Sequence, residues 1–246
     1  MKENAPVLIT GGAQRIGLAT AKLLHQQGNK VVITYRTPKD SLEALEAMGI
    51  TCIQADLSST DGVQSLINEV SNRYSALSAI VHNASDWMAE SDADDLDVLM
   101  HNMWQVHVAA PYKLNLALAP LLDKAAATKG YADIIHMTDF AAQNGSNKHI
   151  AYAASKAGLA NLTLSFAKKL APAIKVNSVA PSLLAFNKGD TDEYKQTSLK
   201  KSLRGIEPGV EEAANAISFI LNSQYYTGRI IELDGGRHLV CGGDKK

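Results

Sequence analysis

Cysteine is scarce in this 246-residue chain, and long apolar runs and an excess of one charge are absent from it. Its two cysteines, Cys52 and Cys241, lie in unrelated contexts without a C-x-x-C pair, which argues against a zinc site and fits a reducing compartment. The longest apolar runs, such as VVIT and IIHM, are far shorter than the roughly 18 residues that indicate a membrane span. Basic residues number 24 and acidic residues 25, both scattered, so we expect neither a nucleic-acid nor a membrane surface.

The amino-terminal segment, MKENAPVLITGG, also lacks the charged and hydrophobic parts of a signal peptide. We therefore expect a cytoplasmic protein. The chain is 46% hydrophobic and long enough to bury a full core, and short apolar runs alternate with helical patterns along it. This alternation predicts one α/β domain over residues 1–246 with a parallel sheet.

A glycine-rich turn, TGGAQRIG, follows the first apolar run and precedes a helical pattern. A strand, such a turn and a helix start present backbone N–H groups to a phosphate. Gly11 and Gly12 allow the tight turn, and Gly17 allows close packing. The alternative is an ordinary strand-to-helix loop. The helical pattern places four apolar residues on one face: Ile16, Ala19, Leu23 and Leu24.

Polar residues follow the next two predicted strands, VVITYR and ITCIQADL. Where chains that bind NAD usually place Asp or Glu, this chain has Arg36 followed by Thr37, and arginine suits a 2′-phosphate. We therefore favour NADPH over NADH, with a solvated strand-end arginine as the alternative. Asp56 ends the third strand, where it could accept from an adenine amino group or cap a helix spanning 58–73.

The fourth predicted strand, LSAIVHNAS, places Asn83, Ala84 and Ser85 at its carboxyl end, the edge at which open α/β sheets bind ligands. Trp87 follows in a loop, where it could stack on a flat substrate or pack the loop against the core. A long helix is predicted over 97–122, with a kink or local break at Pro111. Within it, His107 could face the site, but we expect a core histidine bonded to the backbone.

The segment DFAAQNGSNKHIAYAASK, from Asp139 to Lys156, joins another apolar strand to a helix that runs to about Leu170. In that helix Tyr152 and Lys156 are one turn apart and share a face. An ammonium close to a phenol is expected to lower the phenol pKa and make a proton donor that works near neutral pH. The alternative is a pair of exposed helix residues.

The last third of the chain contains a predicted strand, KVNSVAPSLL, followed by a polar stretch at about 185–205. A loop of that length in a compact domain is usually a lid or binding loop. A helix, EEAANAISFILNS, and a strand, TGRIIELDGG, complete the pattern.

Taken together, TGGAQRIG, HNAS, YAASK and VNSVAPS resemble the short-chain dehydrogenase/reductase family over nearly the whole chain. The resemblance implies a single-domain Rossmann-like doubly wound parallel sheet flanked by helices, an NAD(P)(H) cofactor and usually a homotetramer. It also implies a catalytic Tyr152, with Lys156 holding the nicotinamide ribose as well. The expected cofactor site comprises Gly11, Arg15, Ile16, Gly17, Arg36, Thr37, Asp56, Leu57, Asn83, Ala84, Ser85, Lys156, Pro181, Ser182 and Leu184.

The chain departs from the family pattern in three places: Arg15 replaces a glycine, Asp139 replaces the serine before the tyrosine, and His107 replaces the relay asparagine. The first two, with Ser85 and an aromatic at Trp87, resemble the pteridine reductase branch. That branch implies NADPH-dependent reduction of a 7,8-dihydropterin, by hydride transfer to C6 and protonation of N5, with dihydrofolate as a possible second substrate. The expected substrate site comprises Ser85, Trp87, Asp139 and Tyr152.

Asp139 gives this substrate class a physical reason. A carbonyl reductase needs a neutral hydroxyl beside the developing oxyanion, which an ionised carboxylate would repel. Reduction of a carbon–nitrogen double bond builds no oxyanion but requires a proton, which Asp139 beside Tyr152 could provide or relay. The alternative is that Asp139 merely caps the loop. Two alternatives stay open: a reductase of ketones or 3-oxoacyl thioesters, and a non-catalytic NADP(H)-sensing protein.

Overall fold

The computed structural model describes residues 5–240, so Cys241 and the two ends of the expected 1–246 domain lie outside the described residues. Its centre is a seven-stranded sheet in the order β3-β2-β1-β4-β5-β6-β7, and every neighbouring pair is parallel. This confirms the predicted doubly wound sheet. The strands are β1 (Val7–Ile9), β2 (Val31–Tyr35), β3 (Thr51–Gln54), β4 (Ala79–His82), β5 (Ala132–Met137), β6 (Ile174–Pro181) and β7 (Ile230–Leu233).

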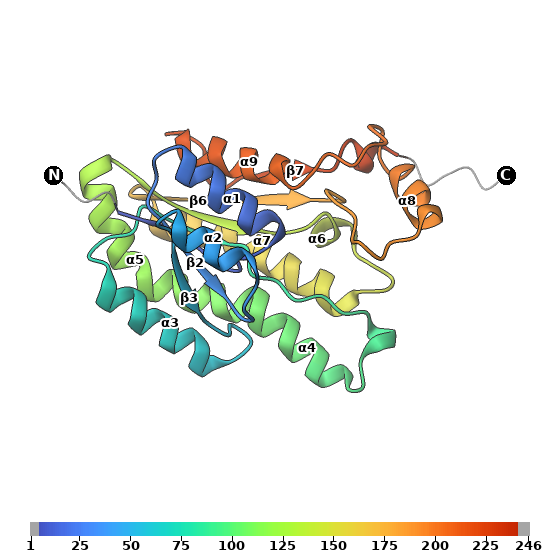
Figure 1. Ribbon diagram of the computed structural model, residues 1–246, viewed down its shortest axis with the longest axis horizontal. Coiled ribbons are helices and arrows are strands. Elements are labelled where there is room, and N and C mark those ends of the chain that lie inside the picture. The colour runs from blue at the N-terminus through green and yellow to red at the C-terminus, as the bar shows by residue number, and fades with distance from the viewer. Residues whose placement is uncertain (1–4, 241–246) are drawn as a thin grey trace.

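Helices cover both faces of the sheet (Figure 1). One layer contains α1 (Arg15–Gln26), α2 (Ser41–Ala47) and α9 (Glu211–Asn222), and the other contains α3 (Thr60–Arg73), α4 (Leu96–Trp104), α5 (Ala110–Lys129) and α7 (Ile150–Leu170). Successive strand residues point to opposite faces. Leu8 and Ile80 therefore pack into the core under α3 and α5, whereas Ile9 and Val81 pack into the core under α1 and α9.

The strand order reverses between β1 and β4, which are neighbours although β2 and β3 lie between them in the sequence. The crossovers therefore diverge at this point, and a crevice forms beyond the carboxyl ends of the strands. The turn after β1 and the loop after β4 meet there. The sheet thus places the candidate residues of both segments on one edge.

The predicted long helix over 97–122 is interrupted in the structure. A π-helical turn, Gln105–Ala109, separates α4 from α5 and contains His107. Pro111 is the second residue of α5, and the helix continues into it from the π turn, so its missing N–H cannot donate to the preceding turn. The π turn directly before Pro111 is the local break expected there.

Two other helices differ from expectation in register. α3 begins at Thr60, after Ser59, whose side chain accepts from the amide of Gly62, and not at Ser58. The fully buried face of α1 consists of Gly17, Thr20, Ala21 and Leu24, while Ile16, Ala19 and Leu23 are only partly buried. Gly17 belongs to this face because α1 packs closely against the turn that precedes it at this point.

The polar stretch at 185–205 is not a structureless loop. It contains α8 (Asp192–Leu199), whose first turn is capped by the side chain of Thr191 accepting from the amide of Tyr194. The short α6 (Ala141–Asn144) and the 3-10 turns η1 (Glu90–Asp92) and η3 (Arg237–Leu239) complete the elements. Over residues 5–240, none of the helices combines the length and apolar character that crossing a membrane requires.

Candidate active site

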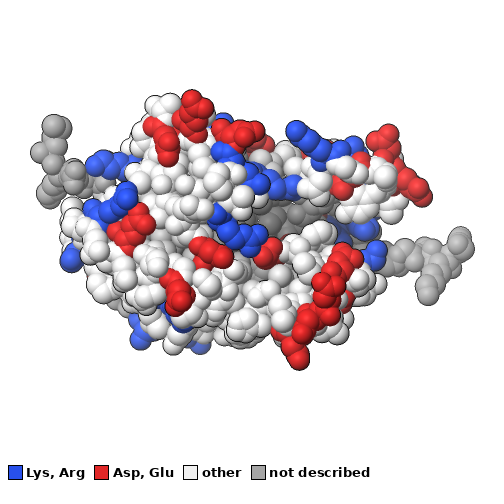
Figure 2. Space-filling model, turned by 60° about the horizontal axis from the view of Figure 1, so that its bottom comes forward, with Lys and Arg blue, Asp and Glu red and all other residues white. Residues whose placement is uncertain are grey.

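A cavity of about 640 Å³ opens at the carboxyl edge of the sheet and is visible as a hollow with charged residues around it (Figure 2). With the exception of Gly17, every residue predicted for the cofactor or substrate site lines this cavity. Gly17 lies behind it, where a Cβ would stand 2.3 Å from the Gly11 carbonyl oxygen and 2.6 Å from Asn83 Nδ2. Lining residues that the sequence did not suggest include Lys39, Asp86, Val106, Met137 and Thr138.

The glycine-rich turn is held in place by the residues that follow β4. The Asn83 side-chain amide donates to the carbonyls of Thr10 and Gly11, and the Thr10 hydroxyl accepts from the amides of Asn83 and Ala84. α1 has no side-chain cap and no acidic residue in its first turn. The free N–H groups of this helix start therefore suit an anion, while the Asn83 side chain braces the turn.

Arg15 explains why this family customarily has glycine at its position. Its φ is +48°, and it is the only non-glycine residue with positive φ in the described part of the chain. Its guanidinium donates to Asn187 Oδ1 at 2.5 Å and to the carbonyl of Ala185 at 3.0 Å. Arg15 therefore connects the glycine-rich turn to the segment that carries α8.

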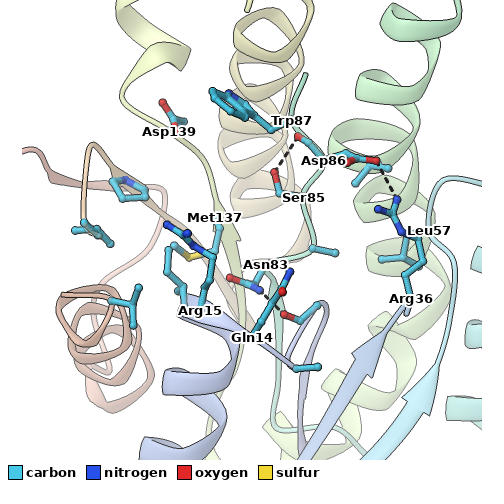
Figure 3. Close-up of a pocket in the computed structure, with 18 of the residues that line it drawn as sticks. Gln14, Arg15, Arg36, Leu57, Asn83, Ser85, Asp86, Trp87, Met137 and Asp139 are labelled. Carbon is cyan, nitrogen blue, oxygen red and sulfur yellow. Dashed lines mark hydrogen bonds and ion pairs between the residues drawn. The ribbon is translucent and has the colours of Figure 1, made fainter. Parts of the chain in front are cut away.

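Arg36 and Asp86 form an ion pair of 2.9 Å at one end of the cavity, away from Asp139 and Trp87 (Figure 3). The hydrogen bond from Arg36 and the charge of Asp86 raise the pKa of the Arg36 guanidinium. Thr37 and Leu57 line the same part of the cavity.

Asp56 does not cap α3, the alternative that its position after β3 suggested. Its carboxylate closes a turn, accepting from both the amide and the hydroxyl of Ser58. The Ser58 hydroxyl is the main cause of a lowered pKa at Asp56. The carboxylate also lines the cavity, so a contact with an adenine amino group stays a prediction.

Tyr152, Lys156 and Asp139 meet in the cavity. The Tyr152 hydroxyl donates to Asp139 Oδ2 at 2.9 Å, and Lys156 Nζ donates to the carbonyl of Met137 at 2.8 Å. Lys156 Nζ lies 5.5 Å from the centroid of the Tyr152 ring. Tyr152 and Lys156 are therefore not a pair of exposed helix residues.

The expected lowering of the phenol pKa is wrong for this structure. Burial and then the Asp139 carboxylate raise the pKa of Tyr152 well above its usual value. Burial lowers the pKa of Lys156 to about 8, and Asp139 opposes that change. Asp139 is hydrogen-bonded to the phenol, whereas the Lys156 ammonium donates to a carbonyl. Of these two charges, the carboxylate therefore has the larger effect on the phenol pKa.

Glu90 holds the start of the helix that carries Tyr152. Its Oε1 accepts from the amide of Ala151 at 2.8 Å, and this backbone bond is the main cause of the lowered pKa of Glu90. His149, at the N-cap position of α7, makes no side-chain cap bond. The sequence carried no signal for this contact, because its partners are 61 positions apart.

His107 faces the cavity side of the fold and is not merely a core histidine bonded to the backbone. Its Nε2 lies 2.8 Å from the Ser85 hydroxyl and 3.3 Å from the Asp86 amide, while Nδ1 lies 2.8 Å from the Ser155 hydroxyl. Burial, and then the charge of Lys156, lower its pKa to about 2, so the ring is neutral.

Trp87 does not pack the loop against the core, because its side chain is 61% exposed. Its ring stacks on His149 with centroids 4.2 Å apart and planes 20° apart. Figure 3 shows Trp87 beside Asp139 at the end of the cavity opposite Arg36. This aromatic face and the carboxylate therefore belong to one part of the cavity.

The parallel sheet, the glycine-rich turn and the Tyr152–Lys156 pair agree with a family model described as enoyl-(acyl carrier protein) reductase, which matches residues 11–238. The chain belongs to the short-chain dehydrogenase/reductase family. Within that family it is 50% identical over 240 residues to the dihydromonapterin reductase of Klebsiella pneumoniae subsp. pneumoniae, covering 97% of this chain and 98% of that one.

Two further comparisons point the same way. The dihydromonapterin reductase of Escherichia coli O6:H1 is 49% identical over 239 residues, covering 96% of this chain and 98% of the relative. The structure of FolM alternative dihydrofolate reductase 1 from Brucella canis, complexed with NADP, superimposes with a TM-score of 0.84 at 28% identity, covering 98% of this chain and 97% of that one.

Proposed function

We propose that this protein is an NADPH-dependent dihydropterin reductase that reduces 7,8-dihydromonapterin, with dihydrofolate as a slower second substrate. The observation that carries the proposal is the 2.9 Å hydrogen bond between Tyr152 and Asp139. The two dihydromonapterin reductases at about half identity and the NADP-bound dihydrofolate reductase neighbour support it.

The residues present suit a phosphorylated dinucleotide. The uncapped start of α1 provides N–H groups for the pyrophosphate, and Arg36 provides a cation for a 2′-phosphate. Lys156 is close enough to Tyr152 to hold a ribose hydroxyl beside it. When bound, NADPH supplies the hydride that is transferred to C6 of the dihydropterin.

The chain itself supplies the proton and the orientation. As C6 receives two electrons, the C6–N5 double-bond pair moves to N5, which then needs a proton. Tyr152 stays protonated because its pKa is raised, and its O–H lies on Asp139. Tyr152 and Asp139 thus share a proton within the cavity. We assign the protonation of N5 to this pair. A bound carbonyl would instead place its developing oxyanion next to a carboxylate.

The rest of the substrate site follows from the same cavity. Trp87 offers an exposed ring on which a flat pterin can stack, a contact worth about 0.5–1.5 kcal/mol beyond burial. The Ser85 hydroxyl and the segment at 185–205, tied to Arg15, lie on the same cavity and would meet the pterin edge and its side chain. We therefore assign substrate binding to this segment.

The proposal includes a homotetramer in the cytoplasm. Large apolar side chains are exposed along α4, α5 and α7, the kind of surface that another subunit covers. They include Leu96, Met100, Trp104, Tyr112, Leu116 and Leu164. A reducing compartment fits a sequence with two cysteines in unrelated contexts.

The test is oxidation of NADPH with dihydromonapterin, dihydrobiopterin, dihydrofolate and an acetoacetyl thioester as separate substrates. We expect turnover with the dihydropterins, fastest with dihydromonapterin, and none with the thioester. Turnover of the thioester alone would replace the proposal with a carbonyl reductase. Binding of NADPH without turnover of any substrate would favour a sensing protein.

A further inference from the structure

A chain of hydrogen bonds runs from helix α7 to the cavity through the π turn between α4 and α5. It joins the backbone carbonyl of Tyr152, the Ser155 hydroxyl, the imidazole of His107 and the Ser85 hydroxyl, with links of 2.7, 2.8 and 2.8 Å. Ser155 is fully buried and His107 is 1% exposed, whereas Ser85 lies on the cavity wall. The hydrogens of this chain decide what Ser85 offers to a ligand.

The hydrogens follow from the backbone groups at the two ends. A carbonyl only accepts, so Ser155 donates its single proton to Tyr152 and its oxygen must accept from Nδ1–H of His107. A backbone amide only donates, so the Asp86 N–H at 3.3 Å requires Nε2 of His107 to be an acceptor. The Tyr152 carbonyl and the Asp86 amide therefore require the same neutral tautomer of His107, with the proton on Nδ1.

The other tautomer would fail at both ends. With the proton on Nε2, the ring N–H would face the Asp86 amide, and two donors would meet. At the same time Nδ1 would need a proton from Ser155, whose hydroxyl would have to leave the Tyr152 carbonyl. Buried polar groups left without partners cost about 1–3 kcal/mol each.

The Ser85 hydroxyl then has one favourable direction for its proton. This proton goes to His107 Nε2 at 2.8 Å, which is closer than the Asp86 carbonyl at 3.3 Å. The Tyr152 hydroxyl is a further neighbour, and its interaction with Ser85 acts to lower the Tyr152 pKa against the effects of burial and Asp139. The lone pairs of the Ser85 oxygen remain for the cavity. An asparagine at 107 would not do this, because its side chain is shorter than that of histidine and has no atom at the Nε2 position, which Ser85 contacts.

We propose that His107 is a positioning residue that holds Ser85 as a hydrogen-bond acceptor and so selects substrates that present an N–H group to it. The inference rests on the proposed function, since a dihydropterin carries several N–H groups. A ketone or thioester carbonyl has only acceptor atoms and receives nothing from Ser85. The pair His107–Ser85 thereby adds to the discrimination that Asp139 provides against carbonyl substrates.

The first test reads the tautomer directly and does not depend on activity. Long-range ¹H–¹⁵N correlation spectra of the ¹⁵N-histidine-labelled protein distinguish protonated from unprotonated ring nitrogens, and His107→Asn identifies the relevant signals among the seven histidines. We expect a protonated Nδ1 and an unprotonated Nε2 at His107. A protonated Nε2 would overturn the inference even if the enzyme reduces dihydropterins.

The second test is kinetic. In His107→Asn, Ser85 is free to rotate, so we expect KM for the dihydropterin to rise about tenfold, the value of one hydrogen bond, with a smaller change in kcat and in KM for NADPH. Ser85→Ala should cost about the same, and the double variant no more than either single one, because both remove one contact. The exposed His101→Asn, outside the cavity, is the matched control.

Ser155→Ala keeps the imidazole and guards against a folding defect at position 107. It removes the acceptor for Nδ1–H and leaves the longer Asp86 amide contact of 3.3 Å as the remaining group that assigns the tautomer. We therefore expect the His107 tautomers to mix in the spectra and KM to rise in the same direction. Additive effects of His107→Asn and Ser85→Ala would overturn the inference. Failure of the unsubstituted enzyme to reduce any dihydropterin would refute the proposed function instead. The tautomer of His107, read from the spectra, would still decide the inference about His107 and Ser85.

Discussion

Asp139 is the side chain on which the proposed distinction from a carbonyl reductase rests. Its two carboxylate oxygens have different partners: Oδ1 accepts from the amide of Ala141 at 2.7 Å, and Oδ2 accepts from Tyr152. The backbone bond fixes the direction of the carboxylate, so the oxygen that faces the phenol stays in the cavity. The charge that raises the phenol pKa is therefore part of the local structure.

Asp139→Asn tests this role with little change of shape. The amide can still bond to the Tyr152 hydroxyl but cannot supply or relay a proton, so we expect kcat for dihydropterin reduction to fall about 10²- to 10⁴-fold. NADPH affinity, measured by fluorescence titration, should change little. An Asp139→Asn enzyme with unchanged kcat would show that the proton reaches N5 by another route.

Arg36 already has a partner, and this affects how cofactor preference should be tested. Arg36→Asp removes the cation and puts a second carboxylate beside Asp86, so NADPH should bind about 10- to 100-fold more weakly and the preference should move toward NADH. Asp86→Asn is the control, since it keeps Arg36 and removes only the competing carboxylate. An unchanged ratio of kcat/KM for NADPH and NADH in Arg36→Asp would refute the 2′-phosphate assignment.

At the scale of elements, one contact ties the cofactor turn to the segment that carries α8. Arg15 adopts a positive φ, which costs a non-glycine residue about 1–3 kcal/mol, and its guanidinium reaches Ala185 and Asn187 on that segment. The backbone strain is accepted where the side chain joins two parts of the cavity. Glu90 makes a similar link between elements, because its side chain, in a turn after β4, accepts a hydrogen bond from the amide of Ala151 at the start of α7.

Arg15→Gly should separate these two effects. Glycine relieves the strain, so thermal stability should be unchanged or slightly higher. The contacts of the Arg15 guanidinium with Ala185 and Asn187 are lost. KM for the dihydropterin should therefore rise several-fold, and limited proteolysis within 186–203 should become faster. A clear fall in Tm together with unchanged proteolysis would indicate that the guanidinium stabilises the fold and does not order this segment.

Across the whole molecule, the carboxyl and amino ends of the parallel strands have different roles. The carboxyl edge holds the cavity, while near the other edge Asp133 and Lys175, paired across β5 and β6, form a buried ion pair. Lys175 also donates to the carbonyl of Ile220, which links the sheet to α9. Burial raises the pKa of Asp133 to about 6, and Lys175 opposes the rise.

Lys175→Met should destabilise the protein by about 3–5 kcal/mol at pH 8, because it leaves a buried carboxylate without its partner. Without Lys175 the pKa of Asp133 rises further, and a raised carboxyl pKa favours the folded state at low pH and ceases to do so as pH rises through it. The loss in urea unfolding should therefore be smaller at pH 5 than at pH 8. Asp133→Asn/Lys175→Met, which has no carboxyl to titrate, should lack this difference.

The proposed tetramer is also a property of the whole molecule. Trp104 is 46% exposed on α4, and part of its ring lies 3.4 Å from where a Cβ on Gly158 of α7 would stand. Trp104→Glu should place a charge in a subunit interface formed by these helices, so light scattering should detect smaller species than for the unsubstituted protein. Glu at Tyr225, which is 98% exposed and lies after α9, is the matched control. Identical masses for all three would exclude an interface at Trp104.

The parallel α/β fold and the residues that gather at one edge of the sheet could be predicted from the amino-acid sequence. Strand period, glycine spacing and helix spacing are local, and the carboxyl ends of parallel strands necessarily share an edge. Tyr152 and Lys156 were found in this way because they are one helical turn apart.

How these residues act on one another could be seen only in the folded molecule. The raised pKa of Tyr152, the bond from Arg15 to Ala185 and the link from His107 to Ser85 depend on burial and on distances between segments far apart in the chain. Solvation and hydrogen-bond direction are set by the packed environment, which no local pattern encodes. The same residue types at the same spacing could have given a lowered phenol pKa and a histidine without contact to the site.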